Sequence, residues 1–364
     1  MPDTQLLVEI DGTAVSADDL AAIVEVVAEE AVDAADAVSV VAAVDADASG
    51  QWTSLLDPLA TPRTPLVVAI SRGEAAYRFE GSSTEADWQL DAAGASQLTV
   101  KALDRTLDMD VEEKVTAWPG TSDSTIAEAI FGTYGLATQI DPTTDAPDPD
   151  VHVVVQRATD WGFLRALAAK WGYATFVESD GTSLIGHFRA IDPLADPQGT
   201  LALGFGGGAT KVSATTKLVA GHHVVGSRLR ALSDGVDSGD GPGDDQAQGK
   251  VVLGGQTTVL LSPTDVFGEV DVTSTAGGLA RQSAYVVSMT VEVDVAVVGL
   301  MLRARRPVLV KGLGDTLSGR YLVQRVRNRV TPVAHTQSAT LVRNALGLSG
   351  DEPWDAGDLL GGLL

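Results

Sequence analysis

Residues 156–179 read QRATDWGFLRALAAKWGYATFVES, which predicts an amphipathic helix followed by a strand. The expected helix covers residues 160–170, with Asp160 as its N-cap and Gly172 just beyond its end. Its large apolar residues recur at helical spacing, a pattern that forms a core more often than a ligand site. We therefore expect a core for a middle domain, built from Trp161, Phe163, Leu164, Leu167, Trp171 and Tyr173.

Glycine, proline and aspartate divide the rest of the chain into short segments. Turn-rich connectors are expected at residues 141–150 and 192–199, and a mobile acidic surface loop at residues 232–249. A second helix is expected at residues 124–134, where isoleucine and phenylalanine share a face behind a Ser/Thr/Asp cluster. Most other segments alternate or are β-branched and predict strands. These strands are expected at residues 66–70, 98–102, 151–156, 251–261 and 321–330.

Residues 17–43 fit two structures equally well. Their alanine and glutamate content favours a helix, whereas the alternation of Val24 with Val26, and of Val38 with Val40, favours strands around a turn at residues 33–36. The pattern alone leaves both interpretations open.

Composition excludes several classes of protein. At 364 residues and 37.6 kDa, the chain is long enough for two or three domains. Zero cysteines exclude disulfides and thiolate metal sites, and no apolar run reaches the roughly 18 residues of a membrane helix. The net charge of −24 argues against nucleic-acid binding and against a membrane-surface anchor.

The charge is unevenly distributed along the chain. Residues 1–50 hold 12 acidic residues and no lysine or arginine, while residues 301–345 hold eight arginines and one lysine against Asp315 alone. Such opposite segments favour pairing, either within one subunit or between subunits.

An arginine ladder is the most informative charged motif. Arg325, Arg327 and Arg329 fall on one face of the expected strand, opposite Val326 and Val330. This pattern fits an ordinary solvated face. It also fits a subunit interface or channel wall, for which the acidic first 50 residues are the candidate counterpart. The C-terminal tail is either a frayed end or a docking peptide. Its candidate docking residues are Trp354, Leu359 and Leu360.

Signals for catalysis are weak. The five histidines lack the HxxxH and HExxH spacings of metal sites, and the glycines at 204–208 lack the Lys-Ser/Thr of a phosphate loop. No Gly-x-Ser-x-Gly elbow is present. We expect no catalytic, cofactor-binding or metal-binding residues, and no enzymatic activity.

The block at residues 156–176 resembles the "Q…TDW-FLR-LA…GY-F-V" segment of the phage late control protein D family, the baseplate hubs of contractile tails, related to the hub part of VgrG spikes. Two departures stand out, because Asn328 occupies the place of a usual histidine and residues 304–307 replace a usual glycine-bearing turn. Other matching segments are LVEIDGT at 7–13, the Trp52 and 55–58 element, FEG at 79–81, KALDRT at 101–106, residues 122–136, residues 312–330 and RNALG at 343–347.

The resemblance implies a mainly β fold with an α/β insertion, two tube-protein-like β-barrel domains per subunit, and a trimeric ring. It assigns strands to residues 17–43. The implied domains are residues 1–108 (first barrel), 109–199 (α/β insertion), 200–346 (second barrel, carrying the acidic loop) and 347–364 (C-terminal tail).

The implied function is a structural baseplate hub that adapts the sixfold inner tube to the threefold spike, in a phage tail or an injection system. Its partners would be two further copies of itself, the inner tube protein, a spike protein and other baseplate components, assembled in the cytoplasm into a virion baseplate or injection particle. The short segment after RNALG favours a separate spike protein. The alternatives are an enzyme-bearing or effector-carrying VgrG-like spike component, and the distal hub of a non-contractile tail.

Overall fold

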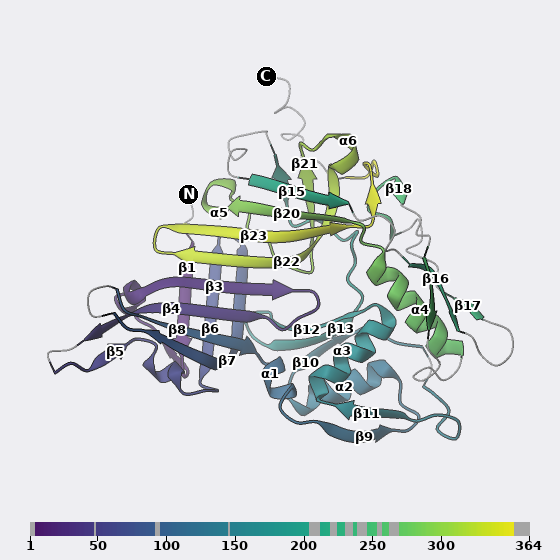
Figure 1. Cartoon of the computed structure of the whole chain (residues 1–364), viewed down its shortest axis with the longest axis horizontal. Coiled ribbons are helices and arrows are strands. Elements are labelled where there is room, and N and C mark those ends of the chain that lie inside the picture. The colour runs from purple at the N-terminus through teal and green to yellow at the C-terminus, as the bar shows by residue number, and fades with distance from the viewer. Residues whose placement is uncertain are drawn as a thin grey trace.

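The computed structural model describes residues 4–46, 49–91, 95–144, 146–203, 212–218, 224–229, 236–238, 246–252, 257–261 and 269–352, and the fold is mainly β (Figure 1). The elements before residue 109 are β1 (Gln5–Ile10), β2 (Thr13–Ala14), η1 (Asp19–Ala22), β3 (Ile23–Ala31), β4 (Ala37–Ala46), β5 (Trp52–Ser54), η2 (Asp57–Ala60), β6 (Pro65–Arg72), β7 (Ala75–Gln89) and β8 (Gln97–Asp104). The next elements are α1 (Thr106–Met109), β9 (Lys114–Trp118), α2 (Asp123–Thr133), β10 (Ala137–Ile140), β11 (Val154–Ala158), α3 (Asp160–Trp171), β12 (Ala174–Ser179) and β13 (Leu184–Arg189).

The elements after residue 199 complete the fold. They are β14 (Thr200–Ala202), β15 (Val212–Leu218), β16 (Val224–Leu229), β17 (Val236–Ser238), β18 (Val251–Val252), β19 (Thr257–Leu261), α4 (Glu269–Ser283), β20 (Val287–Asp294), α5 (Val295–Val298), β21 (Pro307–Lys311), α6 (Gly314–Leu317), β22 (Gly319–Thr331), β23 (Ala334–Arg343) and β24 (Ala345–Leu346).

One large sheet joins the two ends of the chain. Fourteen of the described strands belong to it, in the main order β15-β20-β23-β22-β3-β4-β8-β7-β6-β1-β2. Antiparallel pairing of β22 with β3 makes the connection between the first half and the second. Among the described strands no pairing closes this path into a barrel. The structure therefore shows one continuous sheet, and the two-barrel arrangement stays a prediction.

The ambiguous stretch at residues 17–43 is β-structure. Most of it forms the antiparallel strands β3 and β4, with a turn between Ala31 and Ala37 and a short 3-10 helix before β3. Alternate residues of β4 are buried from Val38 to Val44. The strand assignment is confirmed, because burial on one face of a sheet requires a period of two that a helix cannot supply.

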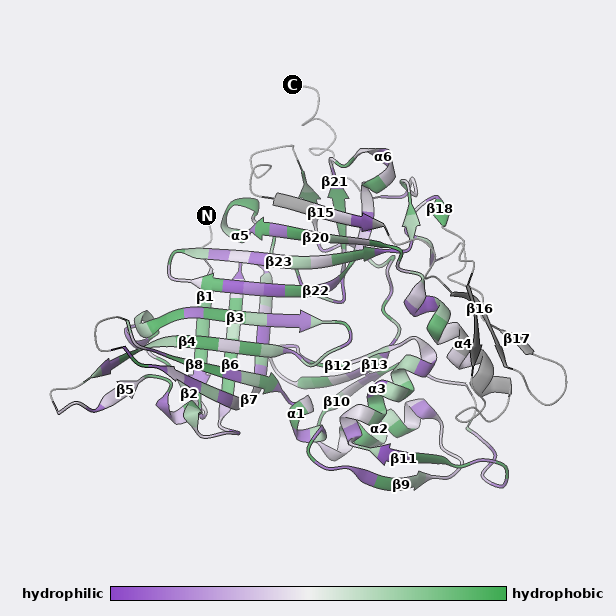
Figure 2. Ribbon diagram, in the orientation of Figure 1, coloured by the Kyte–Doolittle hydropathy of each residue, from purple (hydrophilic) through white to green (hydrophobic). Residues whose placement is uncertain are grey.

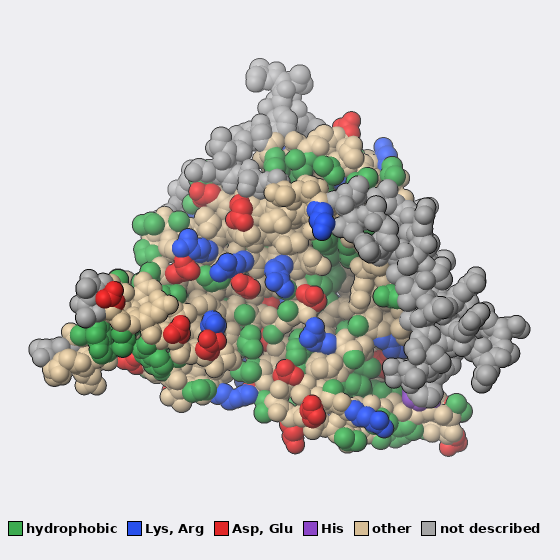
Figure 3. All heavy atoms as spheres, viewed as in Figure 1, with side chains coloured by type: hydrophobic (Ala, Val, Ile, Leu, Met, Phe, Trp, Pro, Cys, Tyr) green, Lys and Arg blue, Asp and Glu red, His purple; other side chains and the backbone are tan. Residues whose placement is uncertain are grey.

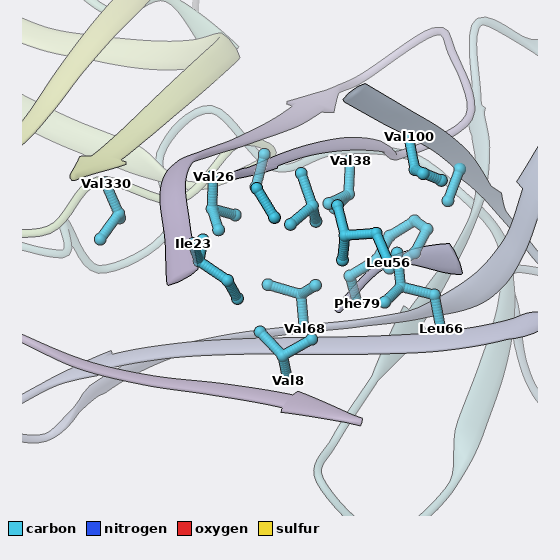
Figure 4. Packing of buried hydrophobic residues seen from close by; sticks show 14 of the residues in the cluster. Val8, Ile23, Val26, Val38, Leu56, Leu66, Val68, Phe79, Val100 and Val330 are labelled. Carbon is cyan, nitrogen blue, oxygen red and sulfur yellow. The ribbon is translucent and has the colours of Figure 1, made fainter. Parts of the chain in front are cut away.

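The sheet encloses an apolar core in the first half. Val8 of β1 and Val68 of β6 lie side by side and point toward Val26 of β3, since β1 and β6 run behind β3 and β4 (Figures 1 and 4). Val330 of β22 belongs to the same cluster. A strand from the second half thus completes the core of the first.

A second cluster fills the space between β20, β21, β22 and β23, and a third belongs to the insertion. Hydrophilic residues concentrate along β22, whereas much of β4 and β6 is hydrophobic (Figure 2). The hydrophobic effect therefore stabilises three separate cores rather than one.

The two predicted helices of the insertion exist with small shifts in their ends. Ser122 caps α2, and Gly172 ends α3 in a left-handed conformation with φ 65°. The N-cap prediction for α3 is wrong by one residue. Thr159 is the cap, because its Oγ1 accepts a hydrogen bond from the Gly162 backbone nitrogen. Asp160 is then free to bind the amide of Gln156 at 2.7 Å.

The expected acidic loop at residues 232–249 falls largely outside the described residues. The described part contains β17, which pairs with β16, so the segment is not loop throughout. A strand of three residues in a glycine-rich, acidic sequence is too short to show the alternation from which β17 could have been predicted. The expected strand at residues 251–261 is represented by β18 and β19 at its two ends.

A buried polar network connects β22 and β23. His335 Nε2 lies 3.1 Å from Asn328 Oδ1, and Gln337 donates to the same oxygen at 2.8 Å. Thr4 Oγ1 lies 3.0 Å from the other ring nitrogen of His335. The imidazole of His335 thus reaches Asn328 from the neighbouring strand. Burial, assisted by Arg72, lowers the pKa of His335 to about 4, with Asp294 opposing.

The low pKa of His335 makes folding sensitive to acid. The unfolded chain takes up the proton near the ordinary value of about 6.5, so this contribution to stability is complete above that pH and is lost as the pH falls toward 4. We expect His335→Gln to reduce the loss of unfolding free energy between pH 7 and pH 5 by up to roughly 2 kcal/mol. Urea unfolding of both proteins at the two pH values measures it, and equal pH dependence would contradict this assignment.

Candidate interface and the buried ionic junction

The predicted arginine ladder lies on the exposed face of β22. Arg325, Arg327 and Arg329 are exposed, while Val326, Asn328 and Val330 on the opposite face of the strand are buried. Basic side chains form a row over β22, with acidic side chains beside them over β3 (Figure 3). These three arginines form the arginine face of the molecule.

Two of the three arginines pair with the acidic first 50 residues of the same chain. Arg327 Nε lies 3.1 Å from Glu29 Oε1, and Arg329 Nη2 lies 2.5 Å from Glu25 Oε2. Both pairs are solvent-exposed and therefore contribute little to stability. In the described part of the chain no carboxylate pairs with Arg325, which lies opposite Ala31 in the register. The face keeps one uncompensated positive charge that another molecule can contact.

A buried ionic junction lies on the other side of the same strands. Glu30 follows Glu29 on β3 but points inward and is only 1% exposed. Arg303 donates from Nε to both carboxylate oxygens of Glu30 at 2.9 Å, and from Nη2 to Oε1 at 2.7 Å. The same Nη2 donates to Glu178 Oε1 of β12 at 2.7 Å. One guanidinium thus links the first half of the sheet to the insertion.

Arg305 makes the second link of the junction. Its Nη2 donates to Asp36 Oδ1 at 2.6 Å and to the Ala31 carbonyl oxygen at 2.7 Å, and its guanidinium lies 4.1 Å from the ring centre of Phe176. The backbone of Arg305 has φ 68°, a left-handed conformation that costs a non-glycine residue about 1–3 kcal/mol. The side-chain contacts explain how an arginine is held in this conformation.

The junction shifts the pKa values of its carboxyl groups in opposite directions. Burial raises the pKa of Asp36 to about 7, with Glu30 and Asp104 adding to the effect and Arg305 opposing it. Burial alone would also raise the pKa of Glu178, but the nearby arginines, Arg303 foremost, hold it below its ordinary value.

Burial disfavours the charge of Arg303 as well. The carboxylates of Glu30 and Glu178 more than offset that effect, so the pKa of Arg303 lies above its usual range. The junction is a set of paired charges whose evident role is to hold three parts of the chain together.

The family-motif residues occupy the insertion rather than the junction. Trp161, Phe163, Leu164 and Leu167 are buried in the insertion core. Trp171 and Tyr173 are only partly buried against it and also line a groove of about 880 Å³ between α3 and the end of α4. The candidate docking residues Trp354, Leu359 and Leu360 lie outside the described residues.

The junction residues were not predicted from the sequence, although one signal was present. Glu30 lies on the same face of β3 as the buried Val26 and Ala28, so a charged side chain occupies a core-facing position. Such a position requires a partner. That partner, Arg303, is separated from it by most of the chain, and no local pattern identifies it.

Other classes of site are not evident in the described ranges. No three His, Asp or Glu side chains there are grouped so as to bind a metal ion. Within the same ranges, no helix combines the length and apolar character required to cross a bilayer.

Glu30 and Glu29 offer a matched pair of substitutions. Glu30→Ala leaves the buried Arg303 without its main counterion, and we expect it to lower the unfolding free energy by roughly 3–5 kcal/mol. Glu29→Ala removes an exposed pair with Arg327 on the same strand and should cost only about 0.2–1 kcal/mol. Urea unfolding at pH 7 compares them. Similar losses for both would show that the junction does not depend on the Glu30–Arg303 pair.

Comparison with solved structures shows the same fold in phage tail proteins. The 43 kDa tail protein of prophage MuSo2 from Shewanella oneidensis matches with a TM-score of 0.66 and 14% identity, over 94% of this chain and 100% of that one. A tail protein from Neisseria meningitidis MC58 matches with a TM-score of 0.64 and 13% identity, over 96% and 99%. The E. coli c3393 protein, described as a component of the type VI secretion system with structural similarity to the T4 tail proteins gp27 and gp5, matches with a TM-score of 0.55 and 10% identity, over 94% and 76%.

Sequence comparison gives a family. No curated protein matches the chain. The family model described as the Alg8 N-terminal domain matches residues 5–217, which is more than half of the 364 residues. The chain therefore belongs to the Alg8 N-terminal domain family.

Proposed function

We propose that this protein is the structural baseplate hub of a contractile phage tail or injection system, of the late control protein D type. Three copies form a ring that adapts a sixfold inner tube to a threefold spike. The ring contacts the tube protein, a spike protein and other baseplate components, acts without catalysis or cofactor, and assembles in the cytoplasm into the virion baseplate or injection particle.

The observation that supports this proposal is the extent of the shared fold. The sheet, the insertion and the second half align over nearly the whole length of two tail proteins. A match that includes both halves and the insertion argues for a common architecture rather than a common small module. Sequence identity to these two tail proteins is only 14% and 13%, so the shared fold does not transfer the roles of individual residues.

The arginine face is the surface we assign to the ring contact or the channel wall. Among the described residues Arg325 has no paired carboxylate, and it lies next to two arginines held by glutamates of β3. Charge pairs at such a contact set register and partner choice more than affinity. They also become weaker as salt rises.

A spike component is the second candidate. The match to the E. coli type VI protein, which covers 76% of that longer chain, favours it. In that case the same ring would carry an enzyme or effector rather than joining a separate spike.

Charge reversal of the arginine face tests the hub proposal. Arg325→Glu with Arg327→Glu turns a cationic face into an anionic one and places a glutamate opposite Glu29. We expect normal folding but at least a tenfold loss of assembled particles counted by electron microscopy. Wild-type particles should show a hub ring of three copies.

The matched control is Arg157→Glu with Arg165→Glu, which changes the net charge equally at exposed positions of the insertion. This control should assemble normally. Normal particles from the arginine-face variant would show that the face is merely solvated, and a ring with a copy number other than three would overturn the hub proposal.

A further inference from the structure

The insertion meets the large sheet through polar and aromatic contacts rather than through a shared apolar core, and its helix α3 packs closely on α4, where Gly278 lies against the backbone of Lys170 and Gly172. Its hydrophobic cluster draws only on residues between Met109 and Phe188, separate from the two clusters of the sheet. Direct hydrogen bonds to the other parts include Glu178 with Arg303, Ser179 with Glu80 at 3.0 Å, and Arg281 with the Trp171 carbonyl oxygen at 2.6 Å. A part with its own core and a polar contact can separate without unfolding.

An aromatic contact lies at the centre of this docking surface. Phe176 of β12 meets the guanidinium of Arg305 at 4.1 Å and is stacked on the imidazole of His187, with ring centres 4.3 Å apart and planes 10° from parallel. His187 is 5% exposed, and its Nδ1 has no hydrogen-bond partner among the described residues. The docked arrangement thus buries an imidazole against an arginine-bound phenyl ring.

The charges that face His187 disfavour a proton on it. Arg305 from the loop before β21 and Arg189 from β13 are both cationic, and Glu178 from β12 is the anion that faces it. Arg303 at 2.7 Å and Arg306 at 3.2 Å already engage that carboxylate. A protonated His187 would therefore be a buried cation without a free counterion.

We propose that the folded core of the insertion, residues 109–189, is an acid-released unit that undocks from the sheet as a folded body when His187 takes up a proton. The undocked imidazole is hydrated, and the positive charge of Arg305 is no longer held against it, while Arg189 on β13 moves together with His187. Protonation of His187 is a local electrostatic change that shifts the equilibrium between the docked and undocked forms.

The direction of the pH effect follows from burial. Burial lowers the pKa of His187 in the docked form to about 4, with Arg189 and Arg305 adding to the effect and Glu178 opposing it. The undocked imidazole titrates near about 6.5. Docking is therefore complete above that pH and is lost as the pH falls toward 4, by up to roughly two orders of magnitude in the equilibrium at pH 4.5.

The remaining charges around Arg305 act in the same direction. Arg305 faces the carboxyl groups of Asp36, in the connection between β3 and β4, and of Glu30 on β3, while Asp104 on β8 acts on Asp36. Because burial raises the pKa of Asp36 to about 7, acid removes one counterion of Arg305. The positive charge facing Phe176 and His187 then increases.

The absence of cysteine from the sequence permits a clean test on the full-length chain. Val115→Cys in the insertion and Val333→Cys in the turn between β22 and β23 place labels at positions 83% and 93% exposed. Single-molecule energy transfer, with labelled chains diluted in unlabelled protein, reports their separation at pH 7.5 and pH 4.5. We expect one population at pH 7.5 and a second, lower-transfer population at pH 4.5, with far-UV circular dichroism unchanged.

Histidine variants decide whether His187 is responsible. His187→Gln, with His187→Leu as a second version, should reduce the acid population at least tenfold. His335→Gln removes the other buried imidazole whose pKa is about 4, inside the sheet, and should leave that population intact. A single population at both pH values, an acid population that persists without His187, or loss of the β signal at pH 4.5 would each overturn the proposal.

Discussion

Hydrogen bonds between β22 and β3 join the two halves of the chain into one sheet, and the register of this pair determines the rest of the structure. With Arg327 opposite Glu29, every arginine of the ladder faces outward, and Val326 and Val330 face the core. A shift by one residue would bury three guanidinium groups and expose the apolar face. The inward side chain of Glu30 then falls beside Arg303, so the same register sets the buried junction.

The junction explains how a polar contact can hold an insertion whose core is separate. Arg303 and Arg305 each contact one part of the sheet and one part of the insertion, through Glu178 and Phe176 respectively. Breaking a buried pair by removing one partner is costly, because a charge is left without compensation. The same arrangement is sensitive to protonation, whereas the three apolar cores are not. The junction therefore contributes to stability and, unlike the apolar cores, responds to pH.

Local patterns predicted much of the fold but not the junction. Alternation placed Arg325, Arg327 and Arg329 on one exposed face, and helical spacing located α2 and α3 to within a residue or two. Residues 17–43 could not be assigned from pattern, because alanine, valine and glutamate satisfy both a helix and a half-buried strand. The N-cap of α3 was misplaced because Thr159 and Asp160 are both good caps. Arg305 required tertiary contacts that no spacing along the chain encodes.

Hydrogen–deuterium exchange of the wild-type protein tests the central role of the β22–β3 pair most directly. Amide exchange in paired strands reports the free energy needed to separate them. If this pair holds the halves together, peptides covering residues 25–31 and 325–330 will stay protected as long as those of β6–β7 in the first half and β20–β23 in the second. Earlier exchange of the β22 and β3 peptides, with both other pairs still protected, would show that the halves separate and would contradict the account.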